Sequence, residues 1–300
     1  MTFASVMELR SFQGVISACL TPNGRYSERI PELVDFHLKH GVKGFFVLGS
    51  AGEGVKLDRE ERAKVAEAVV EYVGSRGLVI IHAGAADLST TKWLVSHASK
   101  VGADAVAAVA PFYHSYDVDS LIAFYQELAK ISSIPLMVYN IPERQGYVIP
   151  VDGLVKILES LGPGSGLKDS SGDPAALLQL QNTLGATHFL ASGGDELMAY
   201  AFIIGCSVHI SGLASVYPEL ANNLYKAVKE GRMVEAFKLQ EKINRINKFF
   251  GKTGPDLAAY RYALKLRDVD LGEPIPPTRG LTVGEKGAVE SFLRTEGLIG

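Results

Sequence analysis

One lysine of the chain, Lys168, lies at the end of a short apolar segment that has the character of a β-strand. Most other lysines fall in helical or loop segments, where a charged side chain is easily solvated. A lysine amine that is removed from water can attack a carbonyl carbon and form a Schiff base. The alternative is structural, because Asp169 follows directly and can form an ion pair with Lys168. The segment therefore predicts either a nucleophile or a paired charge.

Three hydroxyl groups follow other strand-like segments, on Ser50, Tyr113 and Tyr139. A phenol that a second hydroxyl holds in place can carry protons to and from a substrate. Each residue also has a structural explanation, since tyrosines often line the mouths of barrels and Ser50 stands in a glycine-rich turn. Taken with Lys168, the three indicate acid–base chemistry on a carbonyl compound.

The glycine-rich turn covers residues 49–53 (GSAGE), and we expect it to open the second helix of the chain. Backbone N–H groups at such a position bind carboxylates well. The sequence Gly193-Gly194-Asp195 follows a later strand-like segment, at a place where many barrels bind phosphate. The carboxylate of Asp195 disfavours a phosphorylated substrate there.

The positions of these residues depend on a regular alternation of strand-like and helical segments over the first 230 residues. A typical helical segment is Arg59–Val73, with Val65, Val69 and Val73 on one apolar face. Eight alternations predict an α/β fold, a closed (β/α)₈ (TIM) barrel, in which reactive residues gather at the C-terminal ends of the strands. A doubly wound sheet is disfavoured because the only glycine-rich turn has the wrong spacing for a dinucleotide site. The expected strands begin near Gly14, Gly44, Leu78, Asp104, Ile134, Gly164, His188 and Cys206.

After the eighth unit the chain changes character, and residues 231–300 are expected to form a helical extension packed on the barrel of residues 1–230. Helices are predicted at residues 233–250, 255–266 and 283–298, with no strand between them. The proline-rich residues 272–280 are expected to be an ordered linker.

Composition excludes several classes of protein. A content of 47% hydrophobic and 21% charged residues predicts a full apolar core, and a net charge of −3 argues against nucleic acid as a partner. Residues 1–12 lack the apolar core of a signal peptide, and no apolar run approaches the roughly 20 residues that span a bilayer. Only Cys19 and Cys206 occur, which favours a soluble, cytoplasmic protein and leaves one disulfide open.

Seven histidines raise the alternative of a metal-dependent aldolase. His82 and His209 lie in strand-like segments and can face the barrel interior, whereas His37 and His40 share one helix. Neither pair has the spacing, with a nearby carboxylate, that is typical of a metal site. We therefore expect core and surface histidines and no metal.

Three motifs in order carry a family resemblance that covers essentially the whole chain. They are GSAGE at residues 49–53, YNIP at 139–142 and GLKDSSG at 166–172. With them the sequence resembles the dihydrodipicolinate synthase and N-acetylneuraminate lyase family of class I aldolases. The resemblance implies that Lys168 forms an imine with pyruvate, that Tyr139 relays protons, and that Ser50 orients Tyr139. No organic cofactor or metal is implied.

The resemblance also implies partners and further binding residues. Tyr113 matches a tyrosine that reaches into a neighbouring subunit, which implies a tight dimer, commonly doubled to a homotetramer. Ala51 and Gly52 belong to the turn that holds the pyruvate carboxylate, although Ala51 replaces a family threonine. Arg144 matches the arginine that binds the carboxylate of aspartate semialdehyde, and Ile210 on the eighth strand is implied to border the substrate.

The function that follows is a pyruvate-dependent lyase, with dihydrodipicolinate synthase of lysine biosynthesis as the first choice because of Arg144. The bulky residues Val208 and His209 and the loss of a hydroxyl at Ala51 favour the alternatives of a 2-keto-3-deoxygluconate aldolase or an N-acetylneuraminate lyase. A related sugar-acid dehydratase, which forms the same imine but eliminates water, is also open. A non-catalytic ligand-binding barrel is a further alternative. Where the resemblance leads us to expect the polar and histidine positions of lysine-inhibited synthases, this chain has Gly54, Val55, Arg59 and Arg62, so we expect no inhibition by lysine.

Overall fold

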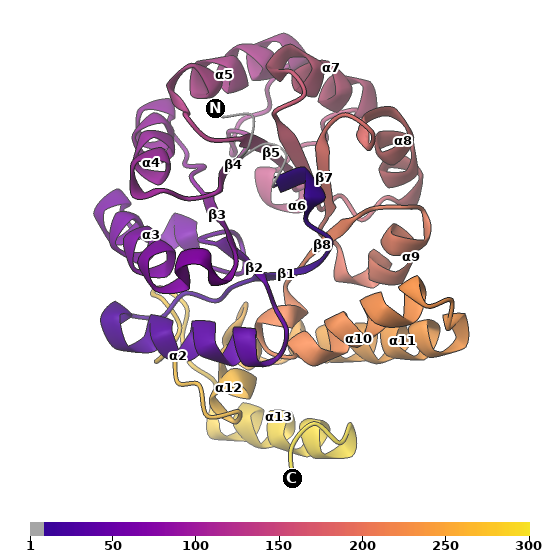
Figure 1. Cartoon of the computed structure of the whole chain (residues 1–300). Coiled ribbons are helices and arrows are strands. Elements are labelled where there is room, and N and C mark those ends of the chain that lie inside the picture. Colours follow the sequence, from indigo (N-terminus) through magenta and orange to yellow (C-terminus); the bar gives the residue numbers. More distant parts are fainter. Residues whose placement is uncertain (1–8) are drawn as a thin grey trace.

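The strands of the computed structural model, which describes residues 9–300, form one closed parallel barrel (Figure 1). Each strand pairs with the next, and β1 closes the barrel by pairing with β8. All eight expected strands are confirmed, with starts within two residues of the predicted positions. They are β1 Gly14–Ala18, β2 Gly44–Val47, β3 Leu78–His82, β4 Ala105–Val109, β5 Leu136–Asn140, β6 Gly166–Asp169, β7 Phe189–Ser192 and β8 Val208–Ser211.

Helices surround the barrel and connect successive strands, which confirms the predicted (β/α)₈ architecture (Figure 1). Asp58 is the N-cap of α3, because its side chain accepts a hydrogen bond from the amide of Glu61 at 2.7 Å. The helices are α2 Tyr26–Lys39, α3 Arg59–Val73, α4 Leu88–Val101, α5 Val118–Ile131, α6 Pro142–Gln145, α7 Val151–Leu161, α8 Pro174–Leu184, α9 Met198–Ile203, α10 Pro218–Lys229, α11 Met233–Phe250, α12 Ala258–Lys265 and α13 Val283–Thr295. Short 3₁₀ turns are η1 Gly54–Lys56, η2 Gly74–Arg76, η3 Asp195–Leu197 and η4 Leu213–Ser215.

Apolar side chains form two main layers because successive residues of a strand point to opposite faces. One layer fills the barrel interior and includes Phe46, Met137 and Ile210. The other lies between the strands and the surrounding helices and includes Phe45 and Val138. The interior layer packs below the residues at the C-terminal ends of the strands.

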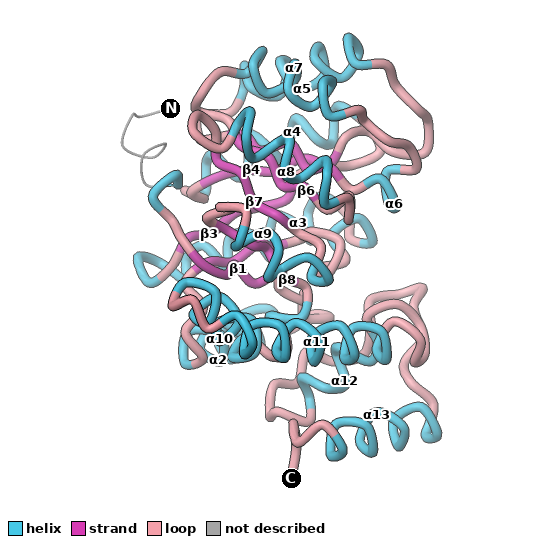
Figure 2. Tube along the Cα trace, turned by 90° about the vertical axis from the view of Figure 1, so that its right-hand side faces the viewer, coloured by secondary structure: helices cyan, strands magenta, loops and turns pink. Residues whose placement is uncertain are grey.

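The C-terminal helices confirm the predicted helical appendage. Helix α11 packs against α10 and α9, and Figure 2 shows α12 and α13 beyond that layer, away from the strands. Helix α12 begins three residues later than predicted, since Leu257 adopts a left-handed conformation with φ of 61°. The predicted division at residue 230 falls between α10 and α11 and stays a prediction.

The proline-rich linker, residues 272–280, forms no helix or strand but is tied to the barrel. The side chain of Asn23 donates hydrogen bonds to the carbonyl oxygens of Glu273 at 3.2 Å and Pro274 at 3.4 Å. The segment is therefore ordered, as predicted.

Both cysteines are buried free thiols, so the disulfide that the sequence left open does not form. Burial raises the pKa of Cys19 and of Cys206 to about 12. Within residues 9–300 no helix is long and apolar enough to cross a membrane. The expected absence of a signal peptide concerns residues 1–12, and residues 1–8 lie outside the described part of the chain.

The turn after β2 is packed so closely that two of its positions require glycine. A Cβ atom on Gly54 would lie 2.0 Å from the carbonyl oxygen of Leu48, and one on Gly52 would lie 2.8 Å from the amide nitrogen of Leu48. Real Cβ atoms do not approach backbone atoms so closely. The shape of this turn is therefore fixed by backbone contact with the end of its own strand.

We expect Gly54→Ala to lower the free energy of unfolding by at least about 2 kcal/mol, because the turn must open to admit the methyl group. Gly287→Ala is the matched control, since a Cβ there meets nothing within 4 Å. It should leave stability unchanged or raise it by up to about 1 kcal/mol. Urea unfolding of both variants measures the difference, and equal stabilities would contradict the steric argument.

Candidate active site

The amine of Lys168 lies inside the mouth of the barrel, between two aromatic rings. Its Nζ atom is 4.2 Å from the ring centroid of Phe46 and 4.2 Å from that of Tyr139, and the residue is only 4% exposed. A Cβ on Gly193 would lie 2.9 Å from its Cε atom, so glycine at 193 leaves room for the chain. Within residues 9–300, no carboxylate lies within 4.0 Å of Nζ.

The structural alternative for this lysine, an ion pair with Asp169, is wrong. Adjacent residues of β6 point to opposite faces, and the Asp169 carboxylate lies on the other side of the strand. It accepts hydrogen bonds from the Asn140 side chain at 2.7 Å and from the Ser171 hydroxyl at 2.8 Å. Burial raises the pKa of Asp169 above its ordinary value. The amine of Lys168 therefore forms no ion pair with Asp169.

Tyr139 connects the lysine to the turn after β2. Its hydroxyl lies 3.3 Å from the Ser50 hydroxyl, and either atom can be the donor. The Tyr139 ring meets the rings of Phe46 and His82 edge to face, at centroid distances of 5.6 and 5.7 Å. Lys168, Tyr139 and Ser50 are thus brought together, as the sequence predicted.

The turn itself differs from the prediction in one respect, because it does not open a helix. Glu53 has a left-handed conformation with φ of 53°, the 3₁₀ turn η1 follows, and α3 begins only at Arg59. The amides of Glu53 and Gly54 bond within the turn, to Ser50 and Gly49. The amides of Ala51 and Gly52 carry no hydrogen bond within the described chain. These two amides, rather than a helix N-terminus, are the groups available to an anion.

His82 fixes the start of the turn and is a core histidine, as expected. Its Nε2 atom accepts a hydrogen bond from the amide of Val109 at 3.2 Å, so Nδ1 carries the proton and donates to the carbonyl oxygen of Leu48 at 3.0 Å. Burial, with the nearby charge of Arg62, lowers the pKa of His82 to about 3. A neutral imidazole therefore holds Leu48, whose φ is 63°.

Glu53 anchors the other end of the turn, and sequence reasoning gave it no role. Its carboxylate accepts hydrogen bonds from Arg261 of α12 at 2.6 Å and from Lys56 at 2.7 Å. Glu53 and Arg261 are 1% and 4% exposed at their side chains, so this is a buried ion pair. Breaking such a pair costs about 3–5 kcal/mol. The appendage thereby holds the glycine-rich turn in place.

A cavity of about 170 Å³ opens above Tyr139 and Ser50. Arg144 on α6 and Asp256 before α12 lie on its wall and form an ion pair at 3.1 Å, with side chains 51% and 52% exposed. The sequence predicted Arg144 but missed Asp256, because 112 residues separate them. The other lining residues are Gly49, Glu53, Val55, Lys56, His82, Val109, Phe112, Ile141 and Leu257.

Several predicted site residues do not line this cavity. Ala51 and Gly52 are not among its lining residues, and neither are Lys168, which is 4% exposed, and Ile210, which is 1% exposed within the barrel interior. Tyr113 does not line it either, and 90% of its surface is exposed, with a φ of 82°. A positive φ is rare for a bulky residue, so the loop holds Tyr113 outward at a cost.

His209 does not face the barrel interior, which corrects one of the two orientations that the sequence left possible. Its neighbours Val208 and Ile210 face inward, so its ring points to the helices and contacts Asp195 at 3.0 Å and Ser192 at 2.7 Å. Burial opposes ionisation of Asp195, but hydrogen bonds led by that from His209 hold its pKa below the ordinary value. The carboxylate of Asp195 therefore serves as a hydrogen-bond acceptor for groups of the protein itself. Within residues 9–300 no group of three potential metal ligands occurs.

Comparison with known proteins places this arrangement in a family. A sequence model of the dihydrodipicolinate synthetase family matches residues 11–296. An uncharacterized DapA-like lyase of Halobacterium salinarum is 36% identical over 259 residues, covering 86% of this chain and 84% of its own. A 4-hydroxy-tetrahydrodipicolinate synthase of Jannaschia sp. is 33% identical over 299 residues, covering 96% and 99%.

Solved structures agree with the sequence comparison. YagE of E. coli K12, a dihydrodipicolinic acid synthase family protein solved with pyruvate, has a TM-score of 0.87 at 26% identity, covering 96% of this chain and 99% of its own. The sialic acid aldolase of Ruminococcus gnavus has a TM-score of 0.89 at 26% identity, covering 94% and 96%. The chain therefore belongs to the dihydrodipicolinate synthetase family and is an enzyme of the lyase class.

Proposed function

We propose that this enzyme joins pyruvate to an aldehyde, or releases it, through an imine on Lys168. The observation that carries the proposal is the position of Lys168 Nζ, which is buried between two rings and free of any carboxylate. A lysine that served only as a structural charge would need a partner, because burying an unpaired charge costs several kcal/mol. A non-catalytic binding barrel would have no use for such an amine.

The chemistry follows from the three residues around the amine. Nζ of Lys168 adds to the ketone carbon of pyruvate, and the ketone oxygen takes up protons and leaves as water. The resulting protonated imine accepts an electron pair, so a proton leaves the methyl group and an enamine forms. The enamine carbon then bonds to the aldehyde carbon, and water finally hydrolyses the imine. Tyr139, held by Ser50, carries the protons, and the scheme calls for no metal or organic cofactor.

Tyr113 supports a further part of the proposal, in which the enzyme is a homotetramer built from tight dimers. Its exposed ring on a strained loop makes no contribution to its own cavity. We infer that it enters the site of a partner subunit and completes the proton relay there. Contacts formed on assembly would offset the free-energy cost of the positive φ of Tyr113.

The first choice of aldehyde is aspartate semialdehyde, which would place the enzyme in lysine biosynthesis in the cytoplasm. Arg144 offers a guanidinium that suits a carboxylate, and its ion pair with Asp256 is half exposed. Exposed pairs contribute only about 0–1 kcal/mol, so a substrate carboxylate can replace Asp256. The same pair favours a second candidate, a hydroxylated aldehyde of the sugar-acid type, because Asp256 cancels the charge of Arg144 and accepts hydrogen bonds.

Substitution of Lys168, Tyr139 or Ser50 should lower the pyruvate-dependent activity by different amounts. We expect Lys168→Arg to lose at least about 10³-fold in kcat, because no imine can form. Tyr139→Phe should lose about 10²–10⁴-fold, and Ser50→Ala about tenfold, the value of one hydrogen bond. Tyr72→Phe, which removes a surface hydroxyl bonded to Asp35, is the control and should be unchanged. A Lys168→Arg enzyme with a tenth of wild-type activity would refute the proposal.

The two acceptors can be separated by Arg144→Gln and Asp256→Asn. For aspartate semialdehyde, Arg144→Gln should raise KM at least about tenfold, and Asp256→Asn should lower it by freeing the guanidinium. For a hydroxylated aldehyde such as glyceraldehyde, Asp256→Asn should instead raise KM. Arg76→Gln breaks the equally exposed pair with Asp35 and serves as the control. Measuring KM for both aldehydes distinguishes the two acceptors. If neither KM changes in either variant, Arg144 and Asp256 do not bind the acceptor.

A further inference from the structure

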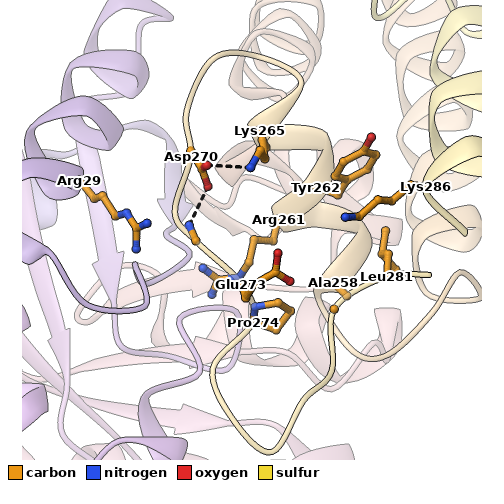
Figure 3. A pocket seen from close by; sticks show the side chains of 12 residues that line it. Arg29, Ala258, Arg261, Tyr262, Lys265, Asp270, Glu273, Pro274, Leu281 and Lys286 are labelled. Carbon is orange, nitrogen blue, oxygen red and sulfur yellow. Dashed lines mark hydrogen bonds and ion pairs between the residues drawn. The ribbon is translucent and has the colours of Figure 1, made fainter. Parts of the chain in front are cut away.

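A second cavity, of about 290 Å³, lies between the barrel and the appendage, outside the cavity above Tyr139. Figure 3 shows its walls, with Arg29 of α2 on one side, Arg261, Tyr262 and Lys265 of α12 behind, and Lys286 of α13 opposite Arg29. Asp270, Glu273 and Pro274, from the segment after α12, also line it. Its volume is near the lower end of the range for small-molecule sites.

The charges of this cavity are only partly paired within the protein. Lys265 pairs with Asp270 at 2.8 Å, and Arg261 pairs with Glu53. Arg29 and Lys286 have no carboxylate within 4.0 Å anywhere in residues 9–300. Arg29 donates to backbone carbonyl oxygens, and Nζ of Lys286 lies 5.5 Å from the centroid of the Tyr262 ring. Two cations on opposite walls are therefore available to a ligand.

Glu273 narrows the chemistry of that ligand. Its carboxylate also lines the cavity and has no cationic partner within 4.0 Å in the described chain. It would repel a simple anion but would accept a hydrogen bond from a hydroxyl or amino group. A small acid that carries its charge towards Arg29 and Lys286, with a donor group towards Glu273, satisfies all three residues.

Direct contacts connect this cavity to the catalytic turn. The carbonyl oxygen of Leu271 accepts hydrogen bonds from Arg29 at 3.3 Å and from Arg261 at 3.2 Å. The same Arg261 guanidinium donates to Glu53 at 2.6 Å and to the carbonyl oxygen of Thr21 at 2.9 Å. A ligand that moves Arg29 thus acts on a carbonyl group shared with the residue that anchors the turn.

We propose that this cavity binds a small hydroxylated or aminated acid, and that its occupancy changes the affinity of the catalytic turn for pyruvate. The second half rests on the function proposed above, whereas the first half does not. Coupling between two sites is a difference in binding free energy, and it commonly amounts to about 5–150-fold in affinity. The contact sequence from Arg29 through Leu271 and Arg261 to Glu53 is the physical connection.

Calorimetric titration of the full chain without pyruvate tests the site by itself. The probes are malate, which carries a hydroxyl group, succinate, which lacks it, and inorganic phosphate. Malate should bind more tightly than succinate, and Lys286→Gln should weaken malate binding at least about tenfold. Lys286 has no ion pair within residues 9–300, and circular dichroism of Lys286→Gln checks that the variant keeps its fold. Lys39→Gln, an exposed lysine on the helix that carries Arg29, is the control and should bind malate as wild type does.

Pyruvate kinetics at saturating malate test the coupling. The KM for pyruvate should change at least about fivefold in the wild type, and Lys286→Gln should need at least about tenfold more malate for the same change. Absence of malate binding up to about 10 mM, or equal binding by Lys286→Gln, would overturn the site. Tighter binding of succinate or phosphate would overturn the role of Glu273. Binding without a change in KM would overturn the coupling, and a protein inert towards pyruvate would sink the proposed function while leaving the calorimetric result valid.

Discussion

The interior of the barrel places one lysine amine among aromatic rings with no opposite charge, and the rest of the site is arranged around it. Lys168 lies 4.2 Å from two ring centroids and receives no ion pair in the described chain. Cation–π contacts contribute about 0.5–2 kcal/mol each, less than the several kcal/mol that burial of a charge costs. Such a position is costly for a structural lysine, and it is the position that a nucleophile requires.

The residues around the amine are held from three directions. The parallel strands bring Tyr139 beside Lys168 in register. Neutral His82 binds Leu48 at the start of the glycine-rich turn. The appendage reaches the other end of the turn through the buried pair of Arg261 and Glu53. Leu48 before the turn and Glu53 within it both have left-handed conformations, which cost free energy, so the helices after the barrel help to hold the turn in its shape.

The sequence was sufficient for the barrel, because periodicity and strand-end residues are local features. Lys168, Tyr139 and Ser50 could be brought together on paper since strand ends meet at one mouth. The roles of Asp256 and Arg261 could not, because they depend on how the appendage folds back across the barrel. The 3₁₀ turn before α3 could not be predicted because it depends on the left-handed conformation of Glu53. The direction in which His209 points could not be predicted without the register of β8 in the barrel.

Trapping of the pyruvate adduct tests the central claim most directly. The wild type and Lys168→Arg would each be mixed with pyruvate, reduced with borohydride, digested, and analysed by mass spectrometry of the peptides. A reduced pyruvyl group on Lys168 of the wild type, absent from the variant, is the predicted result. An unmodified Lys168, or an adduct on another lysine that persists in the variant, would contradict the account.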